Sequence, residues 1–110
     1  YTYEGEWQDG TRSGKGKATF ADGMVYEGDY LNGQRHGKGT IKLIDGFTYT
    51  GDWANGEITG QGMATYANGD VYEGTFQRGK RQGQGTIRFA NGNTASGEWN
   101  NGALVSNSDQ

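Results

Sequence analysis

The sequence contains no cysteine, a single histidine and no long apolar run. Without cysteine the chain forms neither disulfides nor thiolate metal sites, and its compartment cannot be read from thiol chemistry. No segment approaches the roughly 18 consecutive apolar residues of a membrane-spanning helix. Any membrane contact is therefore expected to be peripheral. Hydrophobic residues make up only 31% of the chain, so folding must depend on something other than a large aliphatic core.

The residues of common catalytic sites are also scarce. His36 is the only histidine, and the equivalent repeat positions hold Ser13, Thr59 and Gln82, so a solvated loop residue explains it better than a catalytic base. The Gly-x-Gly pairs lack the strand-to-helix context and the Lys-Ser/Thr ending of a phosphate-binding loop. The net charge of −3 argues against a general nucleic-acid binder. We expect no enzyme activity, cofactor, metal, small-molecule substrate or nucleic acid.

Glycine, in contrast, is abundant and regularly spaced. All 22 glycines fall into five columns that recur every 23 residues, and most aromatic residues keep the same register. One column consists of Gly5, Gly28, Gly51, Gly74 and Gly97. A fixed period of this length predicts stacked repeats that bury their apolar faces against one another. The predicted units are 3–25, 26–48, 49–71, 72–94 and a partial unit 95–102, with 103–110 as a C-terminal cap or tail.

Each unit contains two segments that alternate in polarity, as in Tyr3 to Trp7 and Gly16 to Phe20. Such alternation is typical of half-buried strands. We predict a longer loop between them, Gln8 to Lys15, and a tight turn at Asp22-Gly23 that leads to the next unit. The sequence therefore predicts an all-β fold, an elongated single-layer antiparallel meander of about nine strands.

The glycines inside the strands lie on the aromatic face of each segment. Glycine weakens a strand unless another group must approach closely. We therefore expect Gly5 and Gly16, with their equivalents, to leave room for rings such as Tyr3 to lie flat across the sheet.

The run Tyr-Glu-Gly-Glu-Trp at Tyr3 to Trp7, followed by Asp9-Gly10 and by Gly14-x-Gly16, recurs with small changes in the second and fourth units. It resembles the MORN repeat (membrane occupation and recognition nexus). The resemblance implies twisted sheets of stacked hairpins and a non-catalytic module. It further implies scaffolding, dimerisation, binding of partner proteins in grooves or contact with phospholipids, often beside a separate catalytic domain.

Two surfaces are candidates for binding. The first is an aromatic strip along the concave face, because a single-layer sheet leaves some rings reachable. It consists of Tyr26, Tyr30, Tyr49, Trp53, Tyr66, Tyr72 and Phe76. The second is a row of basic residues in the hairpin loops, which suits anionic lipid. It consists of Arg12, Lys15, Arg35, Lys38, Arg78, Lys80 and Arg81, and the third unit interrupts it with Glu57.

We therefore expect a non-catalytic module for protein interaction or scaffolding. It would bind a protein, including a second copy of itself, through the aromatic concave face or free strand edges. The alternatives are a peripheral phospholipid-binding module that uses the basic loops, and a targeting domain of a larger enzyme. The chain begins with Tyr1 rather than Met, as a piece of a longer protein would. We expect a cytoplasmic location, with the membrane surface as a peripheral alternative.

Overall fold

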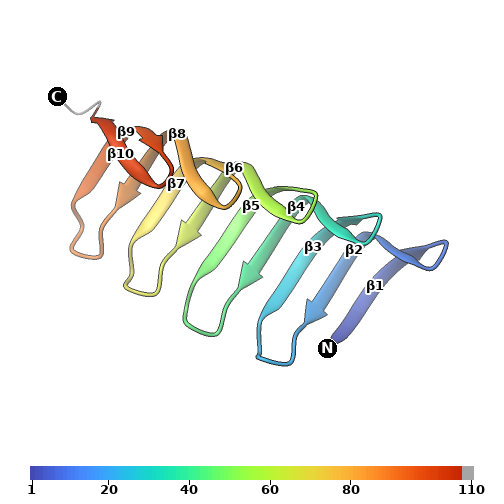
Figure 1. The fold of residues 1–110 in the computed structure, drawn as a ribbon. Helices are drawn as coiled ribbons and strands as arrows, with labels where there is room; N and C mark the ends of the chain where they lie inside the picture. Colours follow the sequence, from blue (N-terminus) through green and yellow to red (C-terminus); the bar gives the residue numbers. More distant parts are fainter. Residues whose placement is uncertain (108–110) are drawn as a thin grey trace.

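The computed structural model describes residues 1–107, which form a single sheet of ten antiparallel strands (Figure 1). The strands are β1 (Thr2–Gln8), β2 (Thr11–Thr19), β3 (Val25–Leu31), β4 (Gln34–Lys42), β5 (Thr48–Ala54), β6 (Glu57–Thr65), β7 (Val71–Gln77), β8 (Lys80–Arg88), β9 (Thr94–Asn100) and β10 (Ala103–Asn107). Their order in the sheet is their order in the sequence. The predicted all-β meander is confirmed.

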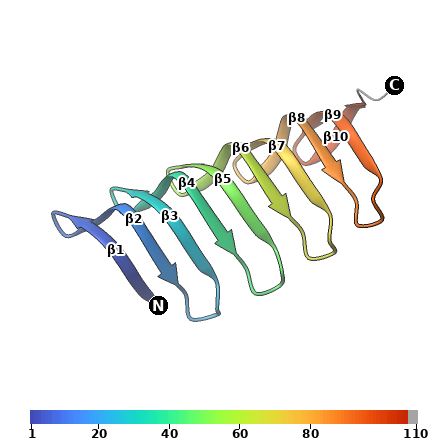
Figure 2. The same cartoon turned by 180° about the vertical axis from the view of Figure 1, so that it is seen from behind.

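The sheet is long and narrow, with dimensions of 53 × 23 × 17 Å. Its outer strands β1 and β10 lie at opposite ends, as both side views show (Figures 1 and 2). The turns between strands lie along the two long sides of the sheet, and each side carries turns of one length. In the described part of the chain no helix is long and apolar enough to cross a membrane.

One long side carries two-residue turns, which we call the short-turn rim. These turns are Asp9-Gly10, Asn32-Gly33, Asn55-Gly56, Arg78-Gly79 and Asn101-Gly102. Both residues of each turn have positive φ, as in Asn55 (53°) and Gly56 (84°), which matches the twist of a tight hairpin. The predicted long loop from Gln8 to Lys15 is wrong, because β2 already begins at Thr11.

The other long side, the long-turn rim, carries the five-residue turns 20–24, 43–47, 66–70 and 89–93. In the first of these, Gly23 N–H donates to the Phe20 carbonyl and Met24 N–H donates to the Asp22 carboxylate. The Asp-Gly pairs therefore do mark turns between repeats. These turns are the longer of the two kinds. Inside the first of them, the side chain of Asp22 forms an Asx turn.

The C-terminal part of the chain completes a fifth hairpin. Ala103–Asn107 forms β10 and pairs with β9 through Ala103↔Asn100 and Leu104↔Trp99. The sheet therefore has one strand more than the nine that the sequence suggests. The cap or tail predicted for 103–110 includes 108–110, which lie outside the described residues.

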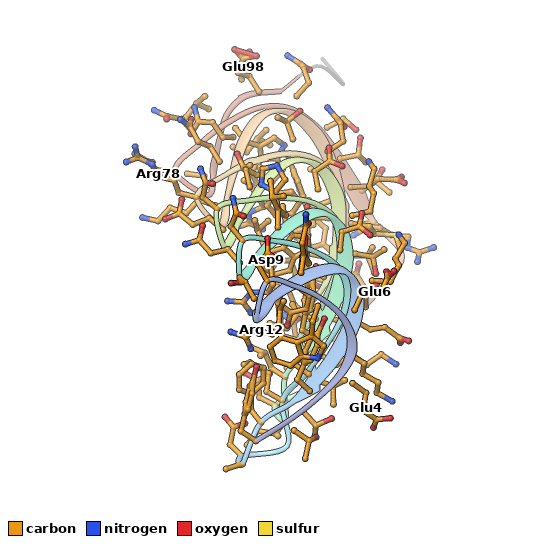
Figure 3. All side chains as sticks on the ribbon, turned by 90° about the vertical axis from the view of Figure 1, so that its right-hand side faces the viewer. Glu4, Glu6, Asp9, Arg12, Arg78 and Glu98 are labelled. Carbon is orange, nitrogen blue, oxygen red and sulfur yellow. The ribbon has the colours of Figure 1, made fainter. Side chains whose placement is uncertain are left out.

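The two faces of the sheet differ in curvature and in chemistry. Viewed along its length the sheet forms an arc, with Glu4 and Glu6 on the convex side and Arg12 on the concave side (Figure 3). The concave face carries the buried core, which is largely aromatic. No charged residue of the described chain is buried, so the polar convex face stays in solvent.

In each repeat a tyrosine ring lies flat over two glycines that face each other across the sheet. Tyr49 covers the pair Gly51↔Gly62, and a Cβ atom on Gly62 would lie 2.5 Å from the ring atom Cζ. Real Cβ atoms do not approach that closely, so no larger residue fits there. This confirms the prediction that the strand glycines make room for rings.

The same tyrosine binds the backbone at an irregularity of the sheet. Between Gly51 and Trp53 the register with β6 shifts, so that the single residue Asp52 lies opposite residues 59–61, and the extra residues form a β-bulge in β6. The Tyr49 hydroxyl donates to the Asp52 carbonyl at 2.9 Å. Three more tyrosines make the equivalent bond. They are Tyr3 to Glu6, Tyr26 to Asp29, and Tyr72 to Thr75.

A continuous ladder of rings connects the repeats. Each tyrosine packs edge-on against the aromatic residue four positions later and against its equivalent in the next repeat. The ring centroids are 5.0 to 5.5 Å apart. The ladder runs through Trp7, Tyr3, Tyr30, Tyr26, Trp53, Tyr49, Phe76, Tyr72 and Trp99. Edge-to-face pairs contribute about 0.5–1.5 kcal/mol each beyond area burial, so aromatic stacking replaces an aliphatic core.

We predict that Gly62→Val destabilises the protein by at least about 3 kcal/mol, because overpacking outweighs the better strand propensity of valine. Urea unfolding followed by circular dichroism measures the loss. Met63→Val is the matched control, since Met63 is 44% exposed on the opposite face of the same strand. It should change stability by less than about 0.5 kcal/mol. An unchanged stability in Gly62→Val would contradict the role given to the glycine pair.

Candidate functional site

The predicted aromatic strip lies in the core rather than at the surface. Tyr26, Tyr49 and Tyr72 are fully buried, and Tyr30, Trp53 and Phe76 are at most 6% exposed. Tyr66, on the long-turn rim, is half-buried. The expectation that these rings are reachable is therefore wrong for six of the seven, because curvature and the next ring of the ladder cover each one. Their role in partner binding stays a prediction.

Burial also shows in the acidity of these tyrosines. Desolvation raises the pKa of Tyr49 to about 12 and raises the pKa of Tyr26 even further above its ordinary value. Both hydroxyls donate to carbonyls of residues that lie opposite a bulge, Asp29 and Asp52, and have little contact with water. These groups stay protonated under ordinary conditions, so they act as structural donors.

Three arginines lie over the ladder of aromatic rings, which we call the aromatic floor of the concave face. The guanidinium carbon of Arg35 lies 5.0 Å from the Trp53 ring centroid, and that of Arg81 lies 4.9 Å from the Trp99 centroid. Arg12 lies over Tyr3 and Tyr30 in the same manner. These distances are in the range of cation–π contacts. The sequence pattern does not predict this role, because it suggests loops for Arg12 and Arg35. Both residues belong to strands and lie over the aromatic rings.

Two lysines of the basic set lie on the opposite, convex face. Lys15 pairs with Asp29, and Lys38 pairs with Asp52. The Lys15 ammonium, together with the Lys38 backbone N–H, holds the pKa of Asp29 below its ordinary value. Lys38 and the Gln61 N–H do the same for Asp52. The convex face thus carries ion pairs that join successive hairpins.

The structure therefore does not bring the seven basic candidates together. Arg12, Arg35 and Arg81 stack on rings in the concave face, while Lys15 and Lys38 form pairs on the convex face. Arg78 and Lys80 are exposed at the short-turn rim, and neither forms an ion pair within residues 1–107. A common lipid-facing row is absent from this arrangement because strand alternation distributes the basic residues over both faces.

His36 has a structural partner. Its Nδ1 accepts a hydrogen bond from the Asn55 backbone N–H at 3.4 Å, which links two neighbouring hairpins. Gln82 accepts the equivalent bond from Asn101. Since a glutamine can replace it in this contact, the histidine has a local structural explanation that needs no catalytic chemistry.

What remains accessible on the concave face is a groove between the two rims. One hollow of about 400 Å³ is bordered by Arg12, Phe20, Tyr30, Gln34 and Arg35. A second, of about 260 Å³, is bordered by residues of both rims, among them Phe47 on one side and Arg78 on the other. Arg35 borders both hollows. The groove combines apolar walls with cationic groups, a lining that suits peptides better than water-soluble metabolites.

The repeat geometry agrees with the comparison with known families. The model of the MORN repeat matches residues 3–25, 26–48, 49–71 and 72–94. The chain belongs to the MORN repeat family. MORN repeats are modules often used in protein or membrane interactions, and the family is generally non-catalytic. No curated protein matches the chain. The matched units coincide with the four units that the glycine columns define, so the predicted resemblance is confirmed.

The convex ion pairs of this MORN array make its stability depend on pH in the acid range. Because the pKa of Asp52 is lowered in the folded state, its stabilisation is present above the ordinary value of 3.8 and is lost as the pH falls through the folded value. We predict that the variant Asp52→Thr loses less stability on acidification than the wild type does. Threonine is the residue that the next unit has at this position, Thr75.

Urea unfolding at about pH 7 and about pH 3 gives the free energy of unfolding of both proteins. Between these two pH values the wild type should lose up to about 1 kcal/mol more of this free energy than the variant does. Equal losses in both proteins would show that this carboxylate contributes nothing to acid sensitivity.

Proposed function

We propose that this MORN array is a non-catalytic protein-interaction module that binds a segment of a partner protein in its concave groove. The main support is the groove lining, because side chains of both rims and three arginines border hollows large enough for side chains. The aromatic ladder stiffens the floor beneath them. A rigid, preformed groove lowers the entropic cost of binding.

The rings themselves are not the contact surface in this proposal. The accessible walls are the half-buried side chains above the floor, such as Leu43, Phe47 and Ile58. Arg35 adds hydrogen-bond donors at the centre of the groove. Apolar walls with a few arginines are typical of the central part of protein interfaces.

The strand edges give a second route for self-association. Among residues 1–107, β1 and β10 each have one neighbouring strand, and such strands can accept a strand from another chain. A second copy that pairs in this way would give a dimer whose population grows with concentration in light scattering. The groove route predicts a monomer with an open concave face.

We predict that a photoreactive amino acid placed at Gln34 or Glu57 forms adducts with a partner protein in a lysate of the native cells. Both residues are exposed and border the groove. The matched control positions are Thr50 and Glu73, which are exposed on the convex face and should give only background. Mass spectrometry of the adducts identifies the contact position and the partner.

Equal adduct yields from both faces would contradict a groove-directed function. Adducts with lipid, together with sedimentation on anionic vesicles at physiological salt that Arg35→Glu, Lys80→Glu and Arg81→Glu abolish, would instead support the phospholipid alternative. Adducts with the chain itself would identify a second copy as the partner.

A further inference from the structure

The third repeat breaks the row of arginines over the aromatic floor. Arg12, Arg35 and Arg81 occupy one repeat position, and Ile58 stands there in the third unit. Ile58 is half-buried and packs on the core without the long stem of an arginine. The hollow of about 260 Å³ lies at this point and is lined largely by apolar residues. Its apolar residues are Ile41, Leu43, Phe47, Trp53 and Ile58.

A second departure from the repeat pattern borders the same hollow. Arg78 occupies a turn position that holds Asp9, Asn32, Asn55 and Asn101 in the other hairpins, and its φ is 52°. Aspartate and asparagine tolerate this left-handed conformation better than arginine does. A residue that opposes local backbone preference at a pocket wall points to a functional requirement. Arg78 lies at the short-turn rim, and its side chain extends outward from the sheet on the same side as Arg12 (Figure 3).

Arg35, on the other side of the hollow, has free hydrogen-bonding capacity. Arg12 and Arg81 each donate to a carbonyl of the next hairpin, that of Gly33 and that of Gly102. Arg35 stacks on Trp53 and Tyr26, and its guanidinium has no hydrogen-bond acceptor within residues 1–107. A stacked guanidinium is held in place and its donors stay available for a carboxylate.

The charges around the hollow are unequal. Arg35 and Arg78 border it together with one acid, Glu57. Neither arginine forms an ion pair with Glu57 in the described chain. The hollow therefore combines an apolar interior with a net positive border, which complements an apolar group flanked by negative charge.

We propose that this hollow binds one large apolar side chain of an acidic peptide, with Arg35 and Arg78 binding carboxylates beside it. The inference rests on the proposed function and specifies the partner's chemistry. A volume of about 260 Å³ is below the usual 300–1,000 Å³ of small-molecule sites and suits a single side chain. A peptide fits better than a membrane, because the two arginines border an apolar hollow that suits a single side chain.

The test selects binders for the wild-type array from a displayed library of random peptides about twelve residues long. Peptides with a large apolar residue next to Asp or Glu should be enriched. The best peptide is then synthesised together with two variants. In one variant its acidic residues are replaced by the corresponding amides, and in the other its large apolar residue is replaced by serine. Each change should weaken binding about tenfold in fluorescence titrations.

Two variants restore the usual repeat residue and should therefore fold. Arg78→Asn should reduce the preference for the acidic peptide over its amide form from about tenfold to about threefold. Ile58→Arg fills the hollow, so it should remove the preference for the apolar anchor over serine. Arg88→Thr is the matched control, because it removes a charge from the convex face and restores the threonine of Thr65. It should leave both preferences unchanged.

Enrichment of no peptide, or of neutral or basic ones, would overturn this inference. Sedimentation of the wild type, but not of Arg78→Asn, on vesicles of phosphatidylserine would also overturn it, in favour of a membrane contact. Neutral groove-binding peptides would leave the proposed function intact, whereas that function fails if the groove positions yield no more protein adducts than the convex control positions.

Discussion

The contact of a tyrosine ring with two glycines determines most of this structure. In each of the four complete repeats the ring lies where any side chain on the glycines would be, and its hydroxyl donates to the carbonyl of the residue that lies opposite the bulge of the neighbouring strand. The bulge bends that neighbouring strand, and the bend curves the sheet around the rings. Glycine, tyrosine and bulge are therefore interdependent, which explains why a chain so poor in aliphatic residues folds.

The same contact prepares the surface on which function is proposed. With the tyrosines buried, the second aromatic column and the arginines form the next layer, and the two rims of turns form the walls. In three repeats an arginine covers this layer, so the groove is cationic and nearly uniform. The third repeat has Ile58 instead, and Arg78 supplies a positive charge from the turn of the next hairpin. The regular repeat array thus has one local irregularity in its groove, at Ile58 and Arg78. We expect this irregularity to select among possible partners.

The sequence was sufficient for the architecture and insufficient for the surfaces. Glycine columns and alternating strands predict the repeat boundaries, the meander and the space beneath rings such as Tyr49, because these depend on local sterics. The turn lengths were misassigned, since Asn-Gly and Asp-Gly occur at both rims and only strand pairing separates them. The burial of Tyr26 and the stacking of Arg35 on Trp53 depend on curvature and on the neighbouring hairpin. The pattern of one repeat contains neither.

A double-mutant cycle between Gly62 and Tyr49 tests the central contact most directly. The three atoms nearest to a Cβ on Gly62 all belong to the Tyr49 side chain, so the steric cost of Gly62→Ala should come mainly from that ring. We predict that Gly62→Ala costs at least about 2 kcal/mol in the wild type and less than about 0.5 kcal/mol in a Tyr49→Leu background. Equal costs in the two backgrounds would contradict the account, because the glycine would then be required for a reason other than the ring.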